Sequence, residues 1–345
     1  MTYLLAGDLG GTKTLLRLVR STSPAKVEFQ QSYQSREHSS LVSIVQQFLA
    51  AAQTQLGLEI AIENACFGIA GAVIDRASYL PNLDWHISAD KIEQELQIPH
   101  VKLINDFVAI GNGVAQLHPE DIHTIQAGQP RINAPKAVIG AGTGLGQGFL
   151  IYDGTDYQVI AAEGGHTDYA ARSIQEFELF QYICQHKQID RVSNERVVSG
   201  PGIVTIYQYL RDTSNLSETP EVAHVVRLWE AQAEQSVDPT GLISALAIAK
   251  TDPLSQATMQ MFVSAYGAES GNLALKILPY GGLYLAGGIA AKNLSLLTEG
   301  TFLTAFNHKG RVSDLLSKIP VHVILNPQVG LMGAMAQAGK LGISD

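Results

Sequence analysis

One segment near the start of the chain most constrains its fold: residues 7–14, which read Gly-Asp-Leu-Gly-Gly-Thr-Lys-Thr. Apolar runs lie on both sides, at 3–6 and 15–19, and two such runs around a glycine pair predict a β-hairpin. Backbone N–H groups in this turn and the Thr12 hydroxyl can approach an anion, and Asp8 can hold a hydrated magnesium ion. The segment therefore predicts nucleotide binding, with an ordinary Gly-Gly hairpin turn as the alternative. A Walker A loop is excluded because Thr12 takes the place of its second glycine and strand-like sequence follows.

The composition is typical of a compact enzyme with two lobes: 345 residues, of which 46% are hydrophobic and 16% charged. A formal net charge of −9 argues against nucleic acid or an anionic membrane as a partner. No apolar run approaches the ~20 residues of a membrane span, and no leader-like segment begins the chain. Cys66 and Cys184 stand alone and far apart, so we expect two buried thiols in a cytoplasmic protein.

The chain repeats one theme, in which an apolar strand ends in a glycine-rich or Asn-Asp turn. Such segments lie at 65–71, 101–106, 137–144 and 283–288. They alternate with stretches that have helical patterns, such as 41–56 and 106–117, and this alternation predicts an α/β fold. The segment 117–120, which contains Pro119, is the expected boundary between the lobes.

A second turn of the same composition lies at Gly142-Thr143-Gly144 and is again followed by an apolar run, 148–152. Two hairpin turns of this kind predict two similar lobes that face one cleft. The glycines at 142, 144, 146 and 148 alternate, whereas the dinucleotide fingerprint has a two-residue gap before its last glycine. A Rossmann dehydrogenase is therefore disfavoured.

Asn105 and Asp106 come where a predicted strand ends and a helix begins. Either residue type is favoured there as a helix N-cap, which is the simpler interpretation. Ligands bind at the carboxyl ends of strands in open α/β sheets, so Asp106 could instead accept a proton from a substrate hydroxyl. Asn105 would then hold a neighbouring hydroxyl.

Two further segments carry polar side chains in glycine-rich surroundings. Glu163-Gly-Gly-His166 has the spacing of a helical di-iron motif, but its glycine pair favours a loop that points both side chains at a small polar ligand. A solvated turn is the alternative. Glu195 shares its segment with Ser199-Gly-Pro-Gly202, a turn that is unusual for a plain surface, although most single glutamates are merely solvated.

Together these motifs resemble the bacterial ATP-dependent glucokinases. Their order is Gly-Asp-x-Gly-Gly-Thr, Ile-Asn-Asp-Phe, Gly-Ala-Gly-Thr-Gly-Leu-Gly, Glu-Gly-Gly-His, Glu-Arg-Val-x-Ser-Gly-Pro-Gly and Ala-Gly-Gly-Ile, from about residue 4 to about residue 339. Each motif alone is weakly specific, and their order and spacing make the set specific. The resemblance implies the hexokinase/actin-like (ribonuclease-H-like) α/β fold, in which a cleft separates a small domain, residues 1–117 plus 327–345, from a large domain, residues 118–326.

The resemblance also implies a role for each matching residue. Asp106 would be the catalytic base. The sugar hydroxyls would be held by Asn82, Asn105, Asp106, Glu163, His166 and Glu195. The first phosphate loop would comprise Asp8, Gly10, Gly11 and Thr12, with Asp8 holding Mg²⁺ through water. The second would comprise Gly142, Thr143 and Gly144, and the adenosine pocket would be lined by Gly287 and Gly288.

On this resemblance, the expected reaction transfers the γ-phosphoryl of ATP to the 6-hydroxyl of glucose at the start of glycolysis. The expected protein is a cytoplasmic homodimer whose partners are glucose and ATP, with no nucleic acid or membrane. One departure is Ala72, where some family members have proline, and no Cys-rich zinc motif like that of the related repressor/kinase sugar family follows His166. The alternatives are a kinase for another hexose or an N-acetylated hexose, and a sugar-responsive regulatory protein on the same fold. An actin-like filament protein or ATPase chaperone would share the phosphate loops but would have no use for the sugar-binding set.

Overall fold

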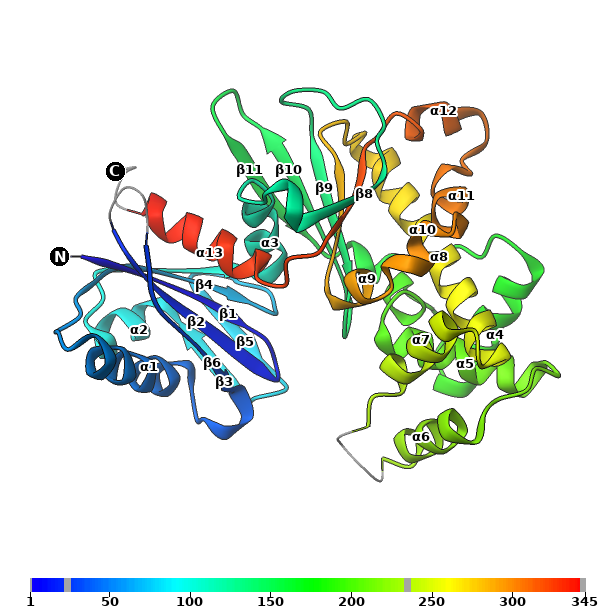
Figure 1. Ribbon diagram of the computed structural model, residues 1–345, viewed down its shortest axis with the longest axis horizontal. Helices are drawn as coiled ribbons and strands as arrows, with labels where there is room; N and C mark the ends of the chain where they lie inside the picture. Colours follow the sequence, from blue (N-terminus) through cyan, green and yellow to red (C-terminus); the bar gives the residue numbers. More distant parts are fainter. Residues whose placement is uncertain (1, 22–25, 233–236, 342–345) are drawn as a thin grey trace. The chain divides into compact units, whose positions relative to one another are not determined.

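The computed structural model describes residues 2–21, 26–232 and 237–341, and the chain divides into two compact units (Figure 1). The first comprises Met1–Pro119, Tyr157–Ala161 and Asn326–Asp345, and the second comprises Glu120–Asp156 and Ala162–Leu325. The expected division placed its boundaries at 117 and 326–327 and kept residues 157–161 in the large domain. Within the described ranges, no helix has the length and hydropathy needed to cross a bilayer.

A mixed sheet forms the centre of the first unit, with its strands in the order β3-β2-β1-β4-β7. β1 pairs antiparallel with β2, and β4 pairs in parallel with both β1 and β7. The expected hairpin is confirmed, because Leu9 pairs with Thr14 at its closed end. The strands of this unit are β1 (Tyr3–Leu9), β2 (Lys13–Arg20), β3 (Lys26–Gln34), β4 (Ile62–Ile69), β5 (Ala77–Leu80), β6 (Trp85–Ser88) and β7 (His100–Asn105), and β11 (Tyr157–Ala162) begins in it.

Helices cover both faces of this sheet (Figure 1). Leu5 of β1 lies in a buried cluster with Phe48 of α1, whereas its neighbour Ala6 lies in a cluster with Leu331 of α13. This alternation follows from the period of two along a strand. The helices are α1 (Leu41–Leu56), α2 (Ala89–Leu96), α3 (Asp106–Val114) and α13 (Val329–Lys340).

Local capping sets where these helices begin and end. Ser40 accepts a hydrogen bond from Ser43 N at the start of α1, and Gly57 ends the helix in the left-handed conformation, so the expected bounds 41–56 are confirmed. The expected helix 106–117 is too long. α3 ends at Val114, where Gln116 N–H donates to Gly113 O at 2.8 Å and closes a tighter turn.

Glycines let α3 and α13 pack at very short range. A Cβ on Gly113 would lie 2.0 Å from Val329 O, and one on Gly333 would lie 1.8 Å from Ala109 O. Neither distance is possible for a real side chain, so these positions fix how α13 lies on the first unit.

Replacing Gly333 by Ala should therefore lower the free energy of unfolding by about 1–3 kcal/mol or more, the usual cost of overpacking. Gly339→Ala is a matched control in the same helix, since its Cβ would meet only Leu4 Cδ1, at 3.8 Å. Because alanine favours a helix more than glycine, this control should be neutral or stabilising. Denaturant unfolding of both variants tests the packing, and equal stability of the two would contradict it.

The second sheet that the structure describes has six strands in the order β11-β10-β9-β12-β13-β8. β9 and β10 form an antiparallel hairpin, and β12 runs parallel to both β9 and β13. The strands are β8 (Ile122–Gln126), β9 (Lys136–Ala141), β10 (Leu145–Tyr152), β12 (Leu283–Ala286) and β13 (Val321–Ile324). The helices are α4 (Ile174–Lys187), α5 (Gly200–Thr213), α6 (Pro220–Glu230), α7 (Pro239–Ala249), α8 (Pro253–Ile277), α9 (Gly288–Lys292), α10 (Leu294–Thr298), α11 (Thr301–Asn307) and α12 (Ser313–Leu316).

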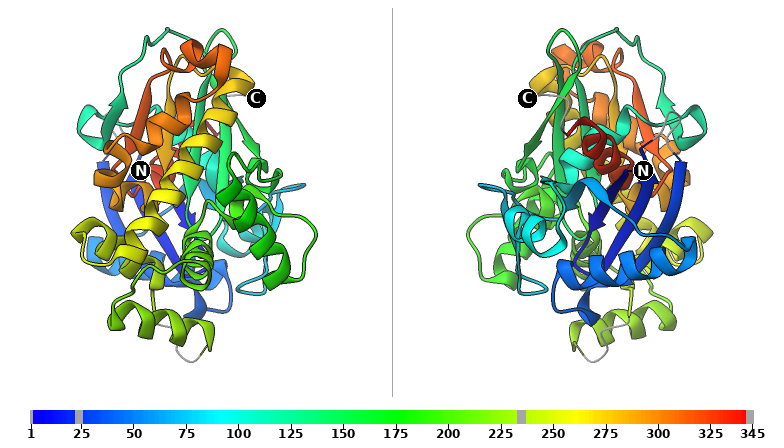
Figure 2. Two further views of the ribbon diagram at one scale, coloured as in Figure 1. Left: turned by 90° about the vertical axis from the view of Figure 1, so that its right-hand side faces the viewer. Right: turned by 90° about the vertical axis from the view of Figure 1, so that its left-hand side faces the viewer.

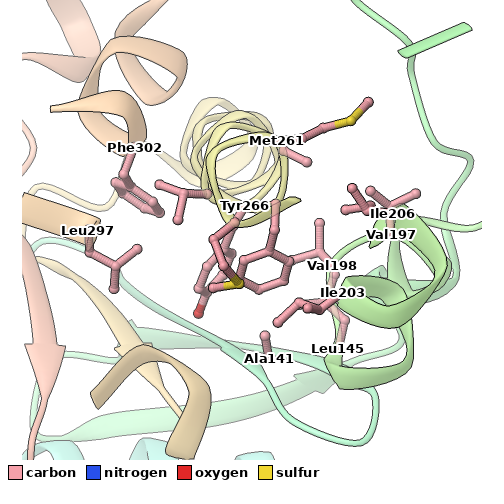
Figure 3. Close-up of a cluster of buried hydrophobic side chains, with 14 of the residues drawn as sticks. Ala141, Leu145, Val197, Val198, Ile203, Ile206, Met261, Tyr266, Leu297 and Phe302 are labelled. Atoms are coloured by element: carbon pink, nitrogen blue, oxygen red, sulfur yellow. The ribbon is translucent and has the colours of Figure 1, made fainter. Parts of the chain in front are cut away.

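The core of the second unit lies around α8, which contacts α5, α7 and α11 (Figures 1 and 2). Figure 3 shows the part of this core that contains Ala141 and Leu145, the residues on either side of the second glycine turn. Tyr266 of α8 lies in the same cluster, and its hydroxyl donates to Ile139 O of β9 at 3.2 Å. Both ends of the turn are therefore anchored in buried structure.

The two cysteines differ in burial. Cys66 is buried in β4, as expected, but Cys184 in α4 is only partly buried, so the expectation of two buried thiols is wrong for Cys184. The buried positions of α4 are those of Glu176, Leu179 and Ile183, and Cys184 follows Ile183 directly, so it lies beside this buried face rather than on it.

Candidate functional site

The buried hydroxyls of Thr14 and Ser35 lie beside the first glycine turn and support it. Gly10 N–H donates to Lys13 O at 2.9 Å, which closes the turn. Ser35, which begins the short 3₁₀ helix η1 (Ser35–Glu37), donates from its N–H to Thr12 O at 2.9 Å and from its hydroxyl to Gly10 O at 3.0 Å. Its hydroxyl also lies 3.0 Å from that of Thr14. Sequence reasoning missed Ser35, because a serine after a strand carries no distinctive signal.

Glycine at position 11 is not demanded by the protein itself. A Cβ there would meet only the Asn82 side chain, at 3.6 Å, an ordinary contact. Among the described residues, a Cβ on Gly142 or Gly288 would have no neighbour within 4 Å, and none of the three glycines has a positive φ. Since packing does not explain glycine at these positions, we infer that a ligand approaches the main chain closely there.

Asp8 lies in β1, two residues before the first turn. Its side chain is half-buried, and burial raises the pKa of this carboxyl from 3.8 to about 6. The first turn of α13 is close by, since a Cβ on Gly330 would lie 3.4 Å from Asp8 Oδ2. A carboxylate in such a position is costly to ionise unless a cation neutralises it.

Replacing Asp8 by Asn should raise the Tm of the magnesium-free protein above pH 6 and leave it unchanged below about pH 4. Below pH 3.8 the carboxyl is protonated whether the chain is folded or unfolded, so its burial costs nothing. The cost grows between 3.8 and about 6, where only the unfolded chain ionises, and is complete above that range. Thermal scans from pH 4 to 8 should show a gain of about 2–4 °C per kcal/mol. Asp190→Asn, at an exposed position, is the control, and a gain that persisted at pH 4 would refute this assignment.

The parallel strands of the first unit end in register. Leu9 of β1 pairs with Ile69 of β4, which pairs with Asn105 of β7. The first glycine turn, the loop at 70–72 and Asp106 therefore follow three adjacent strand ends. Parallel strands lie about 4.8 Å apart, so the turn and Asp106 are about 10 Å from each other along this edge.

Asn105 is both a helix cap and a loop clamp. Its Oδ1 accepts from Phe107 N at 2.8 Å and from Val108 N at 3.3 Å, which confirms the N-cap interpretation. Its Nδ2 donates to Gly71 O at 3.1 Å, so the cap also fixes the loop that lacks proline at Ala72. The Asn105 amide has a second N–H that this hydrogen bond does not use, and that N–H can donate to a ligand.

Asp106 is the first residue of α3 and is half-buried. Its Oδ1 accepts from the N–H of Phe107 at 3.0 Å. An acidic residue in the first turn of a helix is stabilised in its ionised form by the helix dipole. Asn82, in the turn between β5 and β6, lies beside Gly11 of the first glycine turn.

In the second unit, one carboxylate lies against the second glycine turn. Glu195, in the 3₁₀ helix η4 (Asn194–Arg196), accepts from Leu145 N at 3.0 Å through Oε2. A Cβ on Gly144 would lie 2.5 Å from that oxygen, so a larger residue there would displace the Glu195 carboxylate. A second link joins the same segments, because Gly200 N–H donates to Gly142 O at 2.8 Å. The Glu195 segment and the turn therefore form one structure.

The Glu163-Gly-Gly-His166 segment is a loop with a 3₁₀ helix, η3 (Gly164–His166), as its glycine pair predicted. A Cβ on Gly164 would lie 1.9 Å from Gln147 Oε1, and one on Gly165 would lie 2.0 Å from Leu145 O. Both glycines are needed because the loop rests directly on β10. The side chains of Glu163 and His166 are largely exposed, and Glu163 Oε2 lies 3.8 Å from His166 Nε2.

Two cavities meet at the second turn. One, of about 590 Å³, is lined by Gly142, Thr143 and Gly288, together with Trp229, Asp238, Ile289 and Lys292. The other, of about 390 Å³, is lined by Thr143, His166 and Glu195. Thr143, Pro201 and Trp229 line both, so expected nucleotide residues and expected sugar residues meet within one unit. Sequence reasoning missed Trp229 and Lys292, which belong to no recognisable motif.

Two expected site residues lie differently. Glu163 is not among the residues that line either cavity, and Gly287 does not line the larger one. Gly287 has a φ of +86°, and a Cβ there would lie 2.7 Å from Ala141 O. The backbone conformation and this contact therefore explain why residue 287 is glycine. Within the described ranges, no group of three or more His, Cys, Asp or Glu residues could hold a metal ion.

Comparison with known proteins places the chain in a family. The model of the Glucokinase family matches residues 5–340. The glucokinase of Nostoc punctiforme is 51% identical over 346 residues, which cover 99% of this chain and 100% of that protein.

Solved structures share the fold. The crystal structure of a glucokinase from an Antarctic psychrotroph is 26% identical, with a TM-score of 0.77, and covers 97% of this chain and 98% of its own. That of the Balamuthia mandrillaris glucokinase in complex with glucose is 19% identical, with a TM-score of 0.79 over 98% of this chain and 93% of its own. The two-unit α/β fold is therefore that of the glucokinases. With a family model that matches nearly every residue and a relative that is matched along its full length, this chain belongs to the glucokinase family.

Proposed function

We propose that the protein transfers the γ-phosphoryl of ATP to the 6-hydroxyl of D-glucose, giving glucose 6-phosphate and ADP at the start of glycolysis. The observation that carries this proposal is the alignment of strand ends in the first unit. Asp106 and the first glycine turn follow adjacent ends of one parallel set, as a base and a phosphate-binding turn must for transfer between two bound substrates. Membership of the glucokinase family supports the same reaction.

Asp106 is the proposed catalytic base. Its position at the start of α3 favours the carboxylate at neutral pH, so it can orient the sugar hydroxyl and take its proton. The side chains proposed to hold the sugar hydroxyls are those of Asn82, Asn105, Asp106, Glu163, His166 and Glu195. Asn105 and Glu195 each make a hydrogen bond to the backbone with part of their polar group. That bond fixes the rotamer in which the rest of the group would meet the sugar.

ATP is proposed to bind at the two glycine turns, with its adenosine in the cavity of about 590 Å³. Gly11, Gly142 and Gly288 support this, since no contact with the described part of the chain requires glycine at these positions. Backbone N–H groups of Gly10–Thr12 and Gly142–Gly144 would then stabilise charge on the transferring group, whose transition state is loose and spread over its oxygens.

The Asp8 carboxylate fits a magnesium ion, because its burial raises its pKa and a cation would offset that cost. Asp8 would hold the ion through water. When bound, the ion would neutralise phosphate charge. The residues of the chain do the rest by positioning: the turns hold the donor and Asp106 holds the acceptor.

Turnover of a sugar panel with Mg-ATP, followed by coupled ADP detection, tests this function. Glucose should exceed galactose, mannose, fructose and N-acetylglucosamine by at least about 100-fold in kcat/KM, because buried polar groups that read hydroxyls are left unpaired by an altered sugar. Preference for another hexose would contradict glucose as the substrate but would leave the proposed role of Asp106 intact. Sugar and ATP binding without turnover would favour a regulatory protein on the same fold.

The homodimer and the cytoplasmic location also stay proposals, and they rest on the resemblance alone. Light scattering on the purified protein checks the first and should give twice the mass of one chain. Fractionation of producing cells checks the second.

A further inference from the structure

A buried carboxylate in α8 has no part in the proposed reaction. Glu269 is 3% exposed and lies among small buried residues of that helix. Among the described residues, no cationic group lies within 4.0 Å of its oxygens. Burying a charge in this way is costly unless hydrogen bonds compensate, so a purely packing role would be better met by an apolar side chain.

Two amides supply those hydrogen bonds. Gln147 Nε2 donates to Glu269 Oε1 at 2.9 Å, and Asn272 Nδ2 donates to Glu269 Oε2 at 3.1 Å. Asn272 in turn accepts from Lys309 Nζ at 2.6 Å, so a positive charge stands one residue away. Lys309 also donates to Ala268 O at 3.0 Å. Both oxygens of the carboxylate are therefore occupied and its orientation is fixed.

The Glu269 carboxylate sets the direction of the Gln147 amide. Gln147 is 1% exposed in β10, and its hydrogen bond to Glu269 through Nε2 fixes the plane of the amide and therefore where its Oε1 lies. That oxygen lies directly against Gly164, where a Cβ would be 1.9 Å from it. Leu145, two residues earlier on the same face of β10, presses its carbonyl oxygen against Gly165 in the same manner.

The contacts end at the loop that carries Glu163 and His166. Other bonds clamp the far side of this loop, since Arg191 donates to His166 O at 2.9 Å and Asn194 N–H donates to Thr167 O at 2.9 Å. On its other side the loop packs on Gln147 and Leu145 of β10. Gln147 is the polar side chain in this contact, and its amide is hydrogen-bonded to Glu269.

We propose that Glu269 and Gln147 are positioning residues for sugar recognition: Glu269 fixes the Gln147 amide, which fixes Gly164 and with it the directions of Glu163 and His166. This inference rests on the proposed function, in which that loop holds the sugar. A single chain of contacts from α8 to the sugar loop accounts for the buried charge. It also accounts for glycine at 164, since a larger residue there would displace the Gln147 amide from its bond to Glu269.

Gln147→Met and Glu269→Leu, singly and together, test the proposal by steady-state kinetics. Each single variant should raise KM for glucose about 5- to 10-fold, the effect of losing one hydrogen bond, with KM for ATP within about twofold. If Glu269 acts through Gln147, the double variant should be no worse than Gln147→Met alone. Thr258→Val, another buried polar change in α8, controls for lost stability and should leave both KM values unchanged.

Equal changes in KM for glucose and ATP, or an unchanged KM for glucose in Gln147→Met, would overturn the proposal. A second measurement separates its failure from failure of the proposed function. The His166 ring resonance, assigned with a His166→Asn spectrum, should shift in Gln147→Met and Glu269→Leu but not in Thr258→Val, whatever sugar the wild type uses. A ring signal that stayed unshifted in all variants would show that the two residues do not position the loop.

Discussion

Asp106→Asn should lower kcat by about 100- to 10,000-fold, the usual contribution of a general base, while glucose binding stays measurable. The amide has nearly the same shape, and the Asn105 cap of α3 is unaffected, so the helix should keep its start. What is lost is the group that accepts the hydroxyl proton. Rapid-quench measurement of phosphoryl transfer, with calorimetric titration of glucose, checks both parts.

Asp314→Asn is the matched control, because Asp314 is an exposed aspartate in the first turn of another helix, α12. It should leave kcat unchanged. Near-normal turnover by Asp106→Asn would remove Asp106 from the role of base, whereas lost glucose binding would point to a structural role instead.

Gly144→Ala should lower kcat/KM for both substrates by about 100-fold, the scale expected when a catalytic geometry shifts by about 1 Å. The new Cβ would lie 2.5 Å from Glu195 Oε2, so the carboxylate must move and release its bond to Leu145 N. Glu195 lines the cavity of about 390 Å³, where the sugar is proposed to bind, and Leu145 follows the second glycine turn, where ATP is proposed to bind. One methyl group should therefore disturb both substrates. Steady-state kinetics with each substrate varied in turn measures this.

Gly142→Ala is the informative contrast within the same turn. No described residue lies within 4 Å of its Cβ position, so the Tm should not change, and only KM for ATP should rise. In a Glu195→Ala background, Gly144→Ala should add little, since the group it displaces is gone. Equal and independent effects at 142 and 144 would contradict the coupling through Glu195.

Local sequence was sufficient for the parts of the fold that depend on nearby residues. The hairpins at Gly10–Thr12 and Gly142–Gly144 follow from apolar runs around glycine, and α1 follows from a serine cap and a terminal glycine. The order of strands in each sheet was not predictable in this way, because it depends on pairing between distant segments. The end of α3 was misjudged since a single tighter turn at Gln116 leaves no mark in the pattern.

Residue types at the site were predictable, but their partners were not. The motif that contains Glu195 gives no sign that its oxygen meets Leu145 N, about 50 positions away in the chain. Asn105 was open to two interpretations, and the structure confirms the cap while leaving its sugar contact a proposal. Ser35, Gln147 and Glu269 lie outside every motif, and only three-dimensional contacts reveal what they hold.

The most direct test of the proposed phosphoryl transfer is ³¹P NMR of the protein with Mg-ATP and glucose, compared with the same mixture without sugar. We expect one new phosphate ester, identified as glucose 6-phosphate by its coupling to the C6 protons, formed in equal amount to ADP. Without sugar, ATP should persist. Formation of inorganic phosphate alone, or of no product with glucose, would contradict the proposed reaction.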